Sequence, residues 1–145
     1  MSFIIRAATG KDFDAIHVLI QEFASFIQTP EKVSNTPAQM LQDKDFFNCI
    51  VATDDEKIIG FATYFFAYYS WSGRATYLDD LYVTEMHRGK GVGTMLLKYV
   101  IQIAKENNCR KVKWQVSKWN TKAISFYKKL GASTDAIEMN VELAL

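Results

Sequence analysis

The chain has 145 residues, of which 49% are hydrophobic and 14% aromatic, and its formal net charge at pH 7 is +1. This length and composition predict one packed domain over residues 1–145 and exclude a disordered chain. A net charge so close to zero gives no protein-wide field that would attract nucleic acid or a membrane surface, so neither is expected as a partner. Any anion site must therefore be local.

The cysteines and the N-terminus bear on the compartment. Cys49 and Cys109 are too few for a disulfide framework, and no Cys/His spacing is typical of zinc, so no metal is expected. The first residues lack the basic and apolar regions of a signal peptide, and no apolar run approaches the roughly 18 residues of a membrane span. We expect free thiols in a reducing cytoplasm.

The first third of the chain predicts a strand, a long helix and an irregular connection. Phe3–Ala7 is β-prone. Apolar residues then recur at helical spacing, at Phe13, Ile16, Leu19, Ile20, Phe23 and Ile27. Pro30 ends this helix, and Thr36 before Pro37 marks the start of a short second helix.

The middle of the chain predicts an antiparallel meander followed by a parallel crossover. Residues 48–52 and 57–66 flank an acidic turn and should form a hairpin, and residues 74–83 return after a second turn. A helix over 94–107 then leads to an alternating strand at 111–116, which implies a parallel crossover.

The last part predicts one more helix and one more strand. Asn120 caps a helix that runs through Leu130, and Gly131 ends it. Residues 137–145 alternate as a final strand does.

Residues 79–94 join a strand end to a glycine-rich turn that opens a helix. Glycines at 89, 91 and 93 let the backbone adopt positive φ and come close to an anion. A helix N-terminus leaves N–H groups without partners and carries partial positive charge. The junction can therefore hold a pyrophosphate, although a plain strand, turn and helix would give the same pattern.

Three anion-binding motifs compete for this turn. A Walker A loop fails because no Lys-Ser or Lys-Thr pair follows the glycines. A dinucleotide fingerprint fails because the glycine spacing is wrong and the next strand ends without an acidic residue. The third motif, R-x-x-G-x-G, fits at Arg88, Gly91 and Gly93.

This turn resembles the acetyl-CoA site of the GCN5-related N-acetyltransferases (GNAT). A second signature lies downstream, in Asn120-x-x-Ala123-x-x-x-Tyr127-x-x-x-Gly131-Ala132. From Phe3 to about Ala132 the chain is most similar to the spermidine/spermine (diamine) and thialysine N-acetyltransferases. The resemblance implies an α/β (α+β) GNAT fold. Its mixed, mostly antiparallel sheet would have six to seven strands, helices on both faces and a splayed strand pair that binds acetyl-CoA.

By this resemblance, acetyl-CoA is the cosubstrate. The strand end would offer backbone groups to the pantetheine arm, and the turn would offer amides and two basic side chains to the pyrophosphate. The implied cofactor-binding residues are Leu81, Tyr82, Val83, Arg88, Gly89, Lys90, Gly91, Val92, Gly93, Thr94, Asn120 and Ala123. Solvated surface cations would also explain Arg88 and Lys90, and capping alone would explain Asn120.

The resemblance also implies two catalytic residues. Tyr127 would protonate the departing thiolate, and a buried core tyrosine is the alternative. Asp79 stands where the diamine enzymes carry a glutamate that accepts the amine proton through water. It is one methylene shorter, so its action as a direct base stays open, and Asp79 or Asp80 would otherwise hold the ammonium electrostatically or cap a bulge. The implied substrate-binding residues are Glu31, Trp71, Asp79, Asp80, Trp114 and Gln115.

The chain departs from the diamine enzymes at the end of the first helix. Residues 26–31 carry only Glu31, where the diamine enzymes have a glutamate-rich stretch. This favours a shorter or amino-acid-like amine over a long polyamine. A protein or peptide N-acetyltransferase and a non-catalytic acyl-CoA-binding module remain as alternatives. Members of the family commonly dimerise, and the apolar Val141, Leu143 and Leu145 suggest a homodimer contact.

Overall fold

The computed structural model describes residues 2–145. These fall into two compact units, Met1–Trp114 and Gln115–Leu145, and each unit is described separately. The first unit holds one five-stranded sheet and three α-helices. The second unit holds one helix. No helix within residues 2–145 has the length and apolar character needed to cross a membrane.

The sheet of the first unit is mixed and mostly antiparallel. Its strands follow chain order from one edge to the other, and only the last pair, β4 with β5, is parallel. The strands are β1 (Phe3–Ala7), β2 (Asn48–Asp54), β3 (Lys57–Tyr69), β4 (Gly73–Val83) and β5 (Lys111–Lys113). The predicted first strand, hairpin and meander are confirmed.

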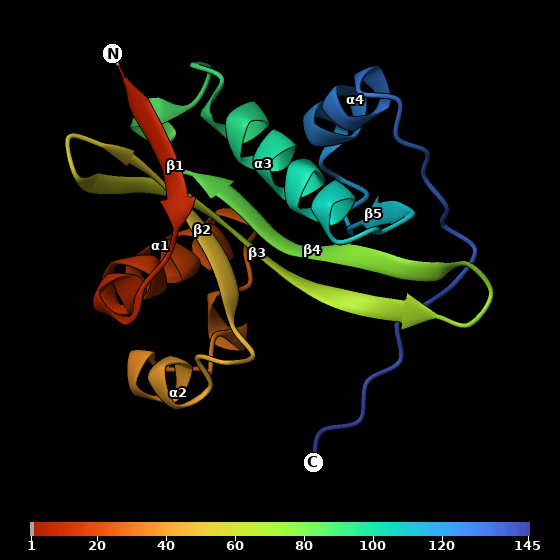
Figure 1. Ribbon diagram of the computed structural model, residues 1–145, viewed down its shortest axis with the longest axis horizontal. Helices are drawn as coiled ribbons and strands as arrows, with labels where there is room; N and C mark the ends of the chain where they lie inside the picture. Colours follow the sequence, from red (N-terminus) through yellow and green to blue (C-terminus); the bar gives the residue numbers. More distant parts are fainter. Residues whose placement is uncertain (1) are drawn as a thin grey trace. The chain divides into compact units, whose positions relative to one another are not determined.

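Helices cover both faces of this sheet, as Figure 1 shows. They are α1 (Phe13–Phe26), α2 (Pro37–Gln42) and α3 (Val92–Glu106). Short 3-10 turns precede α1, α2 and α3, at Gly10–Asp12, Pro30–Lys32 and Glu85–His87. Thr36 caps α2 as predicted, because its hydroxyl accepts the Gln39 N–H at 3.1 Å.

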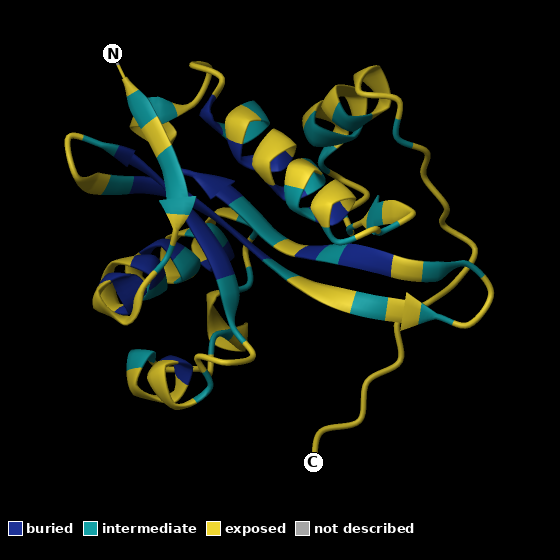
Figure 2. Ribbon diagram, viewed as in Figure 1, coloured by how far each residue is buried: buried dark blue, intermediate teal, exposed yellow. Residues whose placement is uncertain are grey.

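The alternation of β2 divides the core between the two faces. Ile50 and Ala52 pack with Leu96 and Val100 of α3 on one face. Val51, between them, points to the other face and joins the cluster of α1 and α2. Successive side chains of a strand point to opposite faces, so a strand buried on both sides reads as a continuous apolar run. The buried middle of the sheet is visible in Figure 2.

The second unit contains α4 (Thr121–Lys129). Asn120 caps it, since its side-chain oxygen accepts the Ala123 N–H at 3.3 Å. The helix ends in a Schellman motif, in which the Ala132 N–H donates to Tyr127 O and the Gly131 N–H to Lys128 O. Gly131 has φ +91°. Both predicted ends of this helix are therefore confirmed.

One predicted strand is absent and another is shorter than predicted, and the sheet has five strands rather than six or seven. Residues 137–145 form no strand, although their apolar residues alternate. Alternation alone does not make a strand, because a strand needs a partner edge for its backbone hydrogen bonds. The strand predicted at 111–116 stops at Lys113, because β4 offers it partners only at Ala75, Thr76 and Tyr77.

Candidate active site

One extra residue in β4 shapes the centre of the site. Thr63 of β3 pairs with Asp80, whereas the next residue, Tyr64, pairs with Leu78. Asp79 therefore has no partner across the ladder and forms a β-bulge. As a result, Leu78 before the bulge and Leu81 after it both pack against the cluster of α3, although they are three residues apart.

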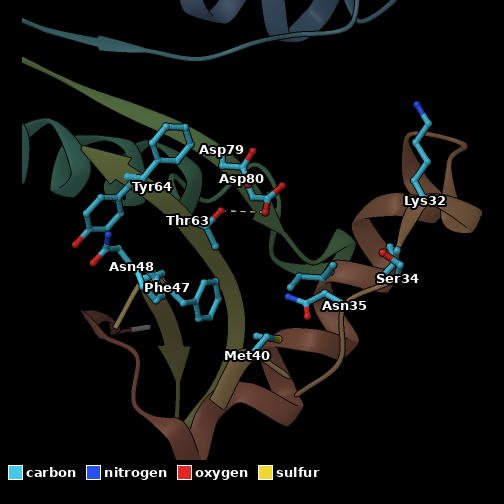
Figure 3. A pocket seen from close by; sticks show the side chains of 14 residues that line it. Lys32, Ser34, Asn35, Met40, Phe47, Asn48, Thr63, Tyr64, Asp79 and Asp80 are labelled. Carbon is cyan, nitrogen blue, oxygen red and sulfur yellow. Dashed lines mark hydrogen bonds between the residues drawn. The ribbon is translucent and has the colours of Figure 1, made fainter. Parts of the chain in front are cut away.

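The bulge brings two consecutive carboxylates to one pocket. Asp79 and Asp80 both line a cavity of about 370 Å³, and we call them the aspartate pair. Thr63 and aromatic residues of β3 form its wall, and residues 32–35 and 46–48 close it from the α1 and α2 side. In Figure 3 the two carboxylates lie next to each other, and the ammonium of Lys32 points away from them.

The aspartate pair has a raised affinity for protons. Burial raises the pKa of Asp80 from 3.8 to about 6, and the charge of Asp79 adds to this effect. The Thr63 hydroxyl, which donates to Asp80 at 2.9 Å, opposes it by stabilising the carboxylate. Burial also raises the pKa of Asp79. A carboxylate with a pKa near neutrality can accept a proton at physiological pH.

Beyond the bulge, one edge of β4 has no neighbouring strand in the described part of the chain. β5 pairs with β4 only at Ala75, Thr76 and Tyr77. On its other side β4 stays paired with β3 as far as Val83. The bulge at Asp79 lies between the stretch of β4 that pairs with β5 and the stretch that does not. Backbone groups of residues 81–83 on this edge can therefore pair with a ligand.

The glycine turn leads from this edge to the N-terminus of α3. Gly89 and Gly91 have φ of +78° and +84°, which side chains other than glycine rarely adopt. A Cβ built on either glycine meets nothing within 4 Å, so the turn borders open space. Gly91 is the N-cap and offers no side-chain acceptor, so the amides of Val92–Thr94 have no capping partner. This end of α3 can bind an anion.

The two basic residues of the turn lie differently. The Arg88 guanidinium turns back to the sheet, where its Nε donates to the Val83 carbonyl at 2.9 Å. Its Nη2 donates to the Tyr82 hydroxyl at 3.2 Å. Lys90 is exposed. Of the two basic side chains, only that of Arg88 makes these contacts with the sheet.

The other predicted site residues are not among the residues that line the pocket. Trp71 is fully exposed in the turn between β3 and β4, and Glu31 is exposed in a 3-10 turn. Trp114 is partly buried against the cluster of α3. Gln115, Asn120, Ala123 and Tyr127 belong to the second unit. Burial raises the pKa of the Tyr127 hydroxyl.

Sequence reasoning missed several residues that line the pocket. Thr63 could have been found, because the register of the predicted hairpins places it opposite the aspartate pair. Asn35 could not, since it lies in an irregular connection, and Asn48 lies at the start of a predicted strand with no signal that links it to the aspartate pair. Among residues 2–145, no cluster of three or more His, Cys, Asp or Glu side chains is suited to hold a metal ion.

The free edge of β4 leads to the N-terminus of α3 and belongs to the strand whose two carboxylates line the pocket. These features can bind an anionic ligand next to a cationic one. Residues 13–132 match the acetyltransferase (GNAT) family. The chain belongs to this family, and it is an acetyltransferase by that membership.

Two curated relatives are similar over most of the chain. One is the thialysine N-epsilon-acetyltransferase of Mus musculus, which is 34% identical over 140 residues, 88% of this chain and 82% of the relative. The other is the spermidine/spermine N(1)-acetyltransferase-like protein 1 of Homo sapiens. It is 36% identical over 141 residues, which make up 90% of this chain and 20% of that longer protein.

A solved structure supports the fold. An aminoglycoside acetyltransferase from an uncultured soil metagenomic sample, solved with trehalose, superposes with a TM-score of 0.80 at 22% identity. The superposition covers 98% of this chain and 97% of that one. The predicted GNAT fold is confirmed, with a sheet of five strands.

The raised pKa of Asp80 predicts a pH-dependent effect on stability. The folded protein binds a proton more tightly than the unfolded chain does, so stability falls as pH rises from about 4 to about 6. The substitution Asp80→Asn should remove this fall in stability with rising pH. We expect the free energy of unfolding of the variant to exceed that of the wild type by about 1–2 kcal/mol at pH 8, after allowing for partial exposure. At pH 3.5 the two free energies should be equal.

Urea unfolding between pH 3.5 and pH 8 measures this difference. Asp55→Asn, in the exposed turn between β2 and β3, is the matched control and should leave stability unchanged at every pH. A difference between Asp80→Asn and wild type that does not vary with pH would show that Asp80 titrates normally.

Proposed function

We propose that the protein transfers an acetyl group from acetyl-CoA to a primary amine of a small molecule, by direct attack of the amine. The observation that carries this proposal is the aspartate pair, which the β4 bulge directs into a pocket beside the free edge of the same strand. An ammonium group bound by Asp79 and Asp80 would lie next to a thioester bound along residues 81–83.

The residues present fit acetyl-CoA. The free edge of β4 suits a pantetheine arm, whose amides can pair with backbone groups as another strand would. The open turn at Gly89 and Gly91, with the first amides of α3, suits the pyrophosphate. Lys90 would add charge. Acetyl-CoA supplies the acetyl group as an activated thioester, and the residues of the chain bind and orient both partners.

The first task of the site is to deprotonate the amine. An amine of lysine-like pKa holds its proton about three units above pH 7, so losing it costs roughly 4–5 kcal/mol. Asp80, with a pKa of about 6, would accept that proton directly or through water. Asp79 would hold the ammonium electrostatically. This assignment moves the predicted role of base from Asp79 to its neighbour.

Two further groups would act on the thioester. The backbone N–H of Leu81, on the strand that carries the aspartate pair, would donate to the carbonyl oxygen as negative charge develops there. The Tyr127 hydroxyl would protonate the departing thiolate. A tyrosine hydroxyl is protonated at neutral pH, as an acid must be, and burial raises the pKa of Tyr127 further.

The pocket lining favours a small amine with one cationic group at the reacting end. Asp79 and Asp80 are the only acidic residues among its lining residues. The additional ammonium groups of a long polyamine would find no further carboxylate in this lining, whereas a short diamine or an amino acid carries fewer ammonium groups to be matched. A cavity of about 370 Å³ suits such a molecule better than a peptide segment.

The oligomeric state and the compartment are also proposed. The apolar residues of the C-terminal segment alternate and are almost fully exposed, at Ile137, Met139, Val141, Leu143 and Leu145. Exposed alternating residues of this kind favour a homodimer in which a second copy covers them. The free thiols of Cys49 and Cys109 are consistent with a cytoplasmic protein.

Sedimentation velocity at micromolar concentration measures the oligomeric state. We expect a dimer for the wild type and a shift towards monomer for the double variant Val141→Asp, Leu143→Asp, because buried unpaired carboxylates oppose the contact. A monomeric wild type would contradict the homodimer.

The proposed reaction predicts a specific pattern of turnover. Incubation with acetyl-CoA and an amine panel should release CoA thiol, with lysine, ornithine, thialysine and putrescine acetylated faster than spermine. Asp80→Asn should lower kcat/KM by about 10²-fold or more, as loss of a general base does. Since ionised Asp80 is the base, activity of the wild type should fall as pH drops through about 6.

Asp55→Asn is again the control and should retain wild-type turnover. A wild type that transfers acetyl to peptides but to no free amine would favour the peptide alternative. CoA binding without any transfer would favour a non-catalytic module.

Tyr127 can be tested separately from the aspartate pair. Tyr127→Phe should lower kcat about 10²-fold, because proton donation to the thiolate is lost, while KM for both substrates changes little. The matched control is Tyr68→Phe, at an exposed position on β3, which should behave as the wild type. Unchanged kcat in Tyr127→Phe would remove this residue from the chemistry.

A further inference from the structure

Arg88 begins the R-x-x-G-x-G motif, yet its side chain is committed to the sheet. Its Nε donates to the Val83 carbonyl at 2.9 Å, and its Nη2 donates to the Tyr82 hydroxyl at 3.2 Å. The guanidinium carbon lies 4.4 Å from the centre of the Phe26 ring in α1, a cation–π contact. These contacts hold Nε and Nη2 of Arg88 against the last residues of β4 and its charge against the Phe26 ring.

Tyr82 extends this set of contacts to α1. Its ring is buried and stacks on Phe23, with 5.1 Å between ring centres. Its hydroxyl donates to Glu22 Oε2 at 2.6 Å and accepts from Arg88. We call Glu22, Tyr82 and Arg88 the α1–β4 chain, because they connect the helix to the strand end by consecutive hydrogen bonds.

The place of this chain in the fold suggests what it does. Residues 81–83 have a strand on only one side, so half of the support that a central strand normally has is missing there. The α1–β4 chain supplies side-chain support at the same residues. It also fixes the peptide at Val83, from which the chain turns towards the glycines and the N-terminus of α3.

We propose that Arg88 is a positioning residue that holds the Val83 end of β4 in place for the donor, and not a ligand of the pyrophosphate. This inference rests on the proposed function, since it concerns the acetyl-CoA edge of the same site. The Val83 carbonyl is an acceptor for Arg88, and the pyrophosphate is met by the first amides of α3 and by Lys90. A lysine at position 88 could not replace Arg88, because its three donors share one nitrogen and do not reproduce the spacing of Nε and Nη2 in the planar guanidinium.

A donor that lacks the pyrophosphate separates the two roles of position 88. S-acetylpantetheine carries the same thioester and pantetheine arm as acetyl-CoA but no pyrophosphate or nucleotide. Initial rates give kcat and KM for both donors, and calorimetric titration gives Kd for CoA and for pantetheine without any reaction. The variants are Arg88→Gln, Arg88→Lys, Tyr82→Phe and Lys90→Gln. Arg74→Gln, at an exposed position of β4, is the matched control.

The proposal predicts losses that do not depend on the pyrophosphate. Arg88→Gln should weaken binding of CoA and of pantetheine by the same factor, about tenfold, as expected for loss of a charge-assisted hydrogen bond. Arg88→Lys should restore the binding of neither ligand, and Tyr82→Phe should weaken the binding of both. Lys90→Gln should weaken CoA alone, and Arg74→Gln should match the wild type.

Two results would overturn the inference while leaving the proposed function intact. One is a loss in Arg88→Gln that is confined to CoA and restored by Arg88→Lys, which would make Arg88 a pyrophosphate ligand. The other is wild-type binding of both ligands in both Arg88→Gln and Tyr82→Phe. If the wild type uses neither donor and binds neither ligand, the proposed function fails and the inference fails with it.

Discussion

The site depends on one extra residue in β4. The bulge at Asp79 shifts the register by one, so the residues before and after it exchange faces of the sheet. It directs two consecutive carboxylates into the pocket, and it occurs where β4 diverges from β5. The pocket and the unpaired edge therefore lie on the same stretch of β4, so the proposed reaction would bring its two substrates next to each other there.

The second constraint is the missing cap of α3. Most helices satisfy their first amides with a side chain at the N-cap, as α2 does with Thr36 and α4 with Asn120. At α3 the N-cap is Gly91, which provides no side chain. The first amides of α3 are therefore available to a ligand, whereas α1, which also lacks a side-chain cap, continues directly from a 3-10 turn. Arg88, the first residue of the motif, instead contacts Val83 and Tyr82 at the end of β4 and Phe26 of α1.

Sequence reasoning recovered what local patterns encode. The alternation of β2 and β3, the proline and glycine boundaries, and the caps at Thr36 and Asn120 follow from neighbours in the sequence, and the structure has them. The register shift at Asp79 could not be predicted, because it depends on pairing with a distant strand. The direction of Arg88 also depends on a distant element, the end of α1. The strand predicted at 137–145 was wrong because alternation does not provide a partner.

The most direct test of the account is an NMR titration of the ¹⁵N-labelled protein with CoA, followed at the backbone amides. The account predicts that the largest shifts occur at residues 81–83 and at Val92–Thr94, while the amides of β1 and β2 stay unchanged. A titration with a short diamine should then shift Asp79 and Asp80 without the α3 amides. Shifts from CoA that avoid both the β4 edge and the start of α3 would contradict the account.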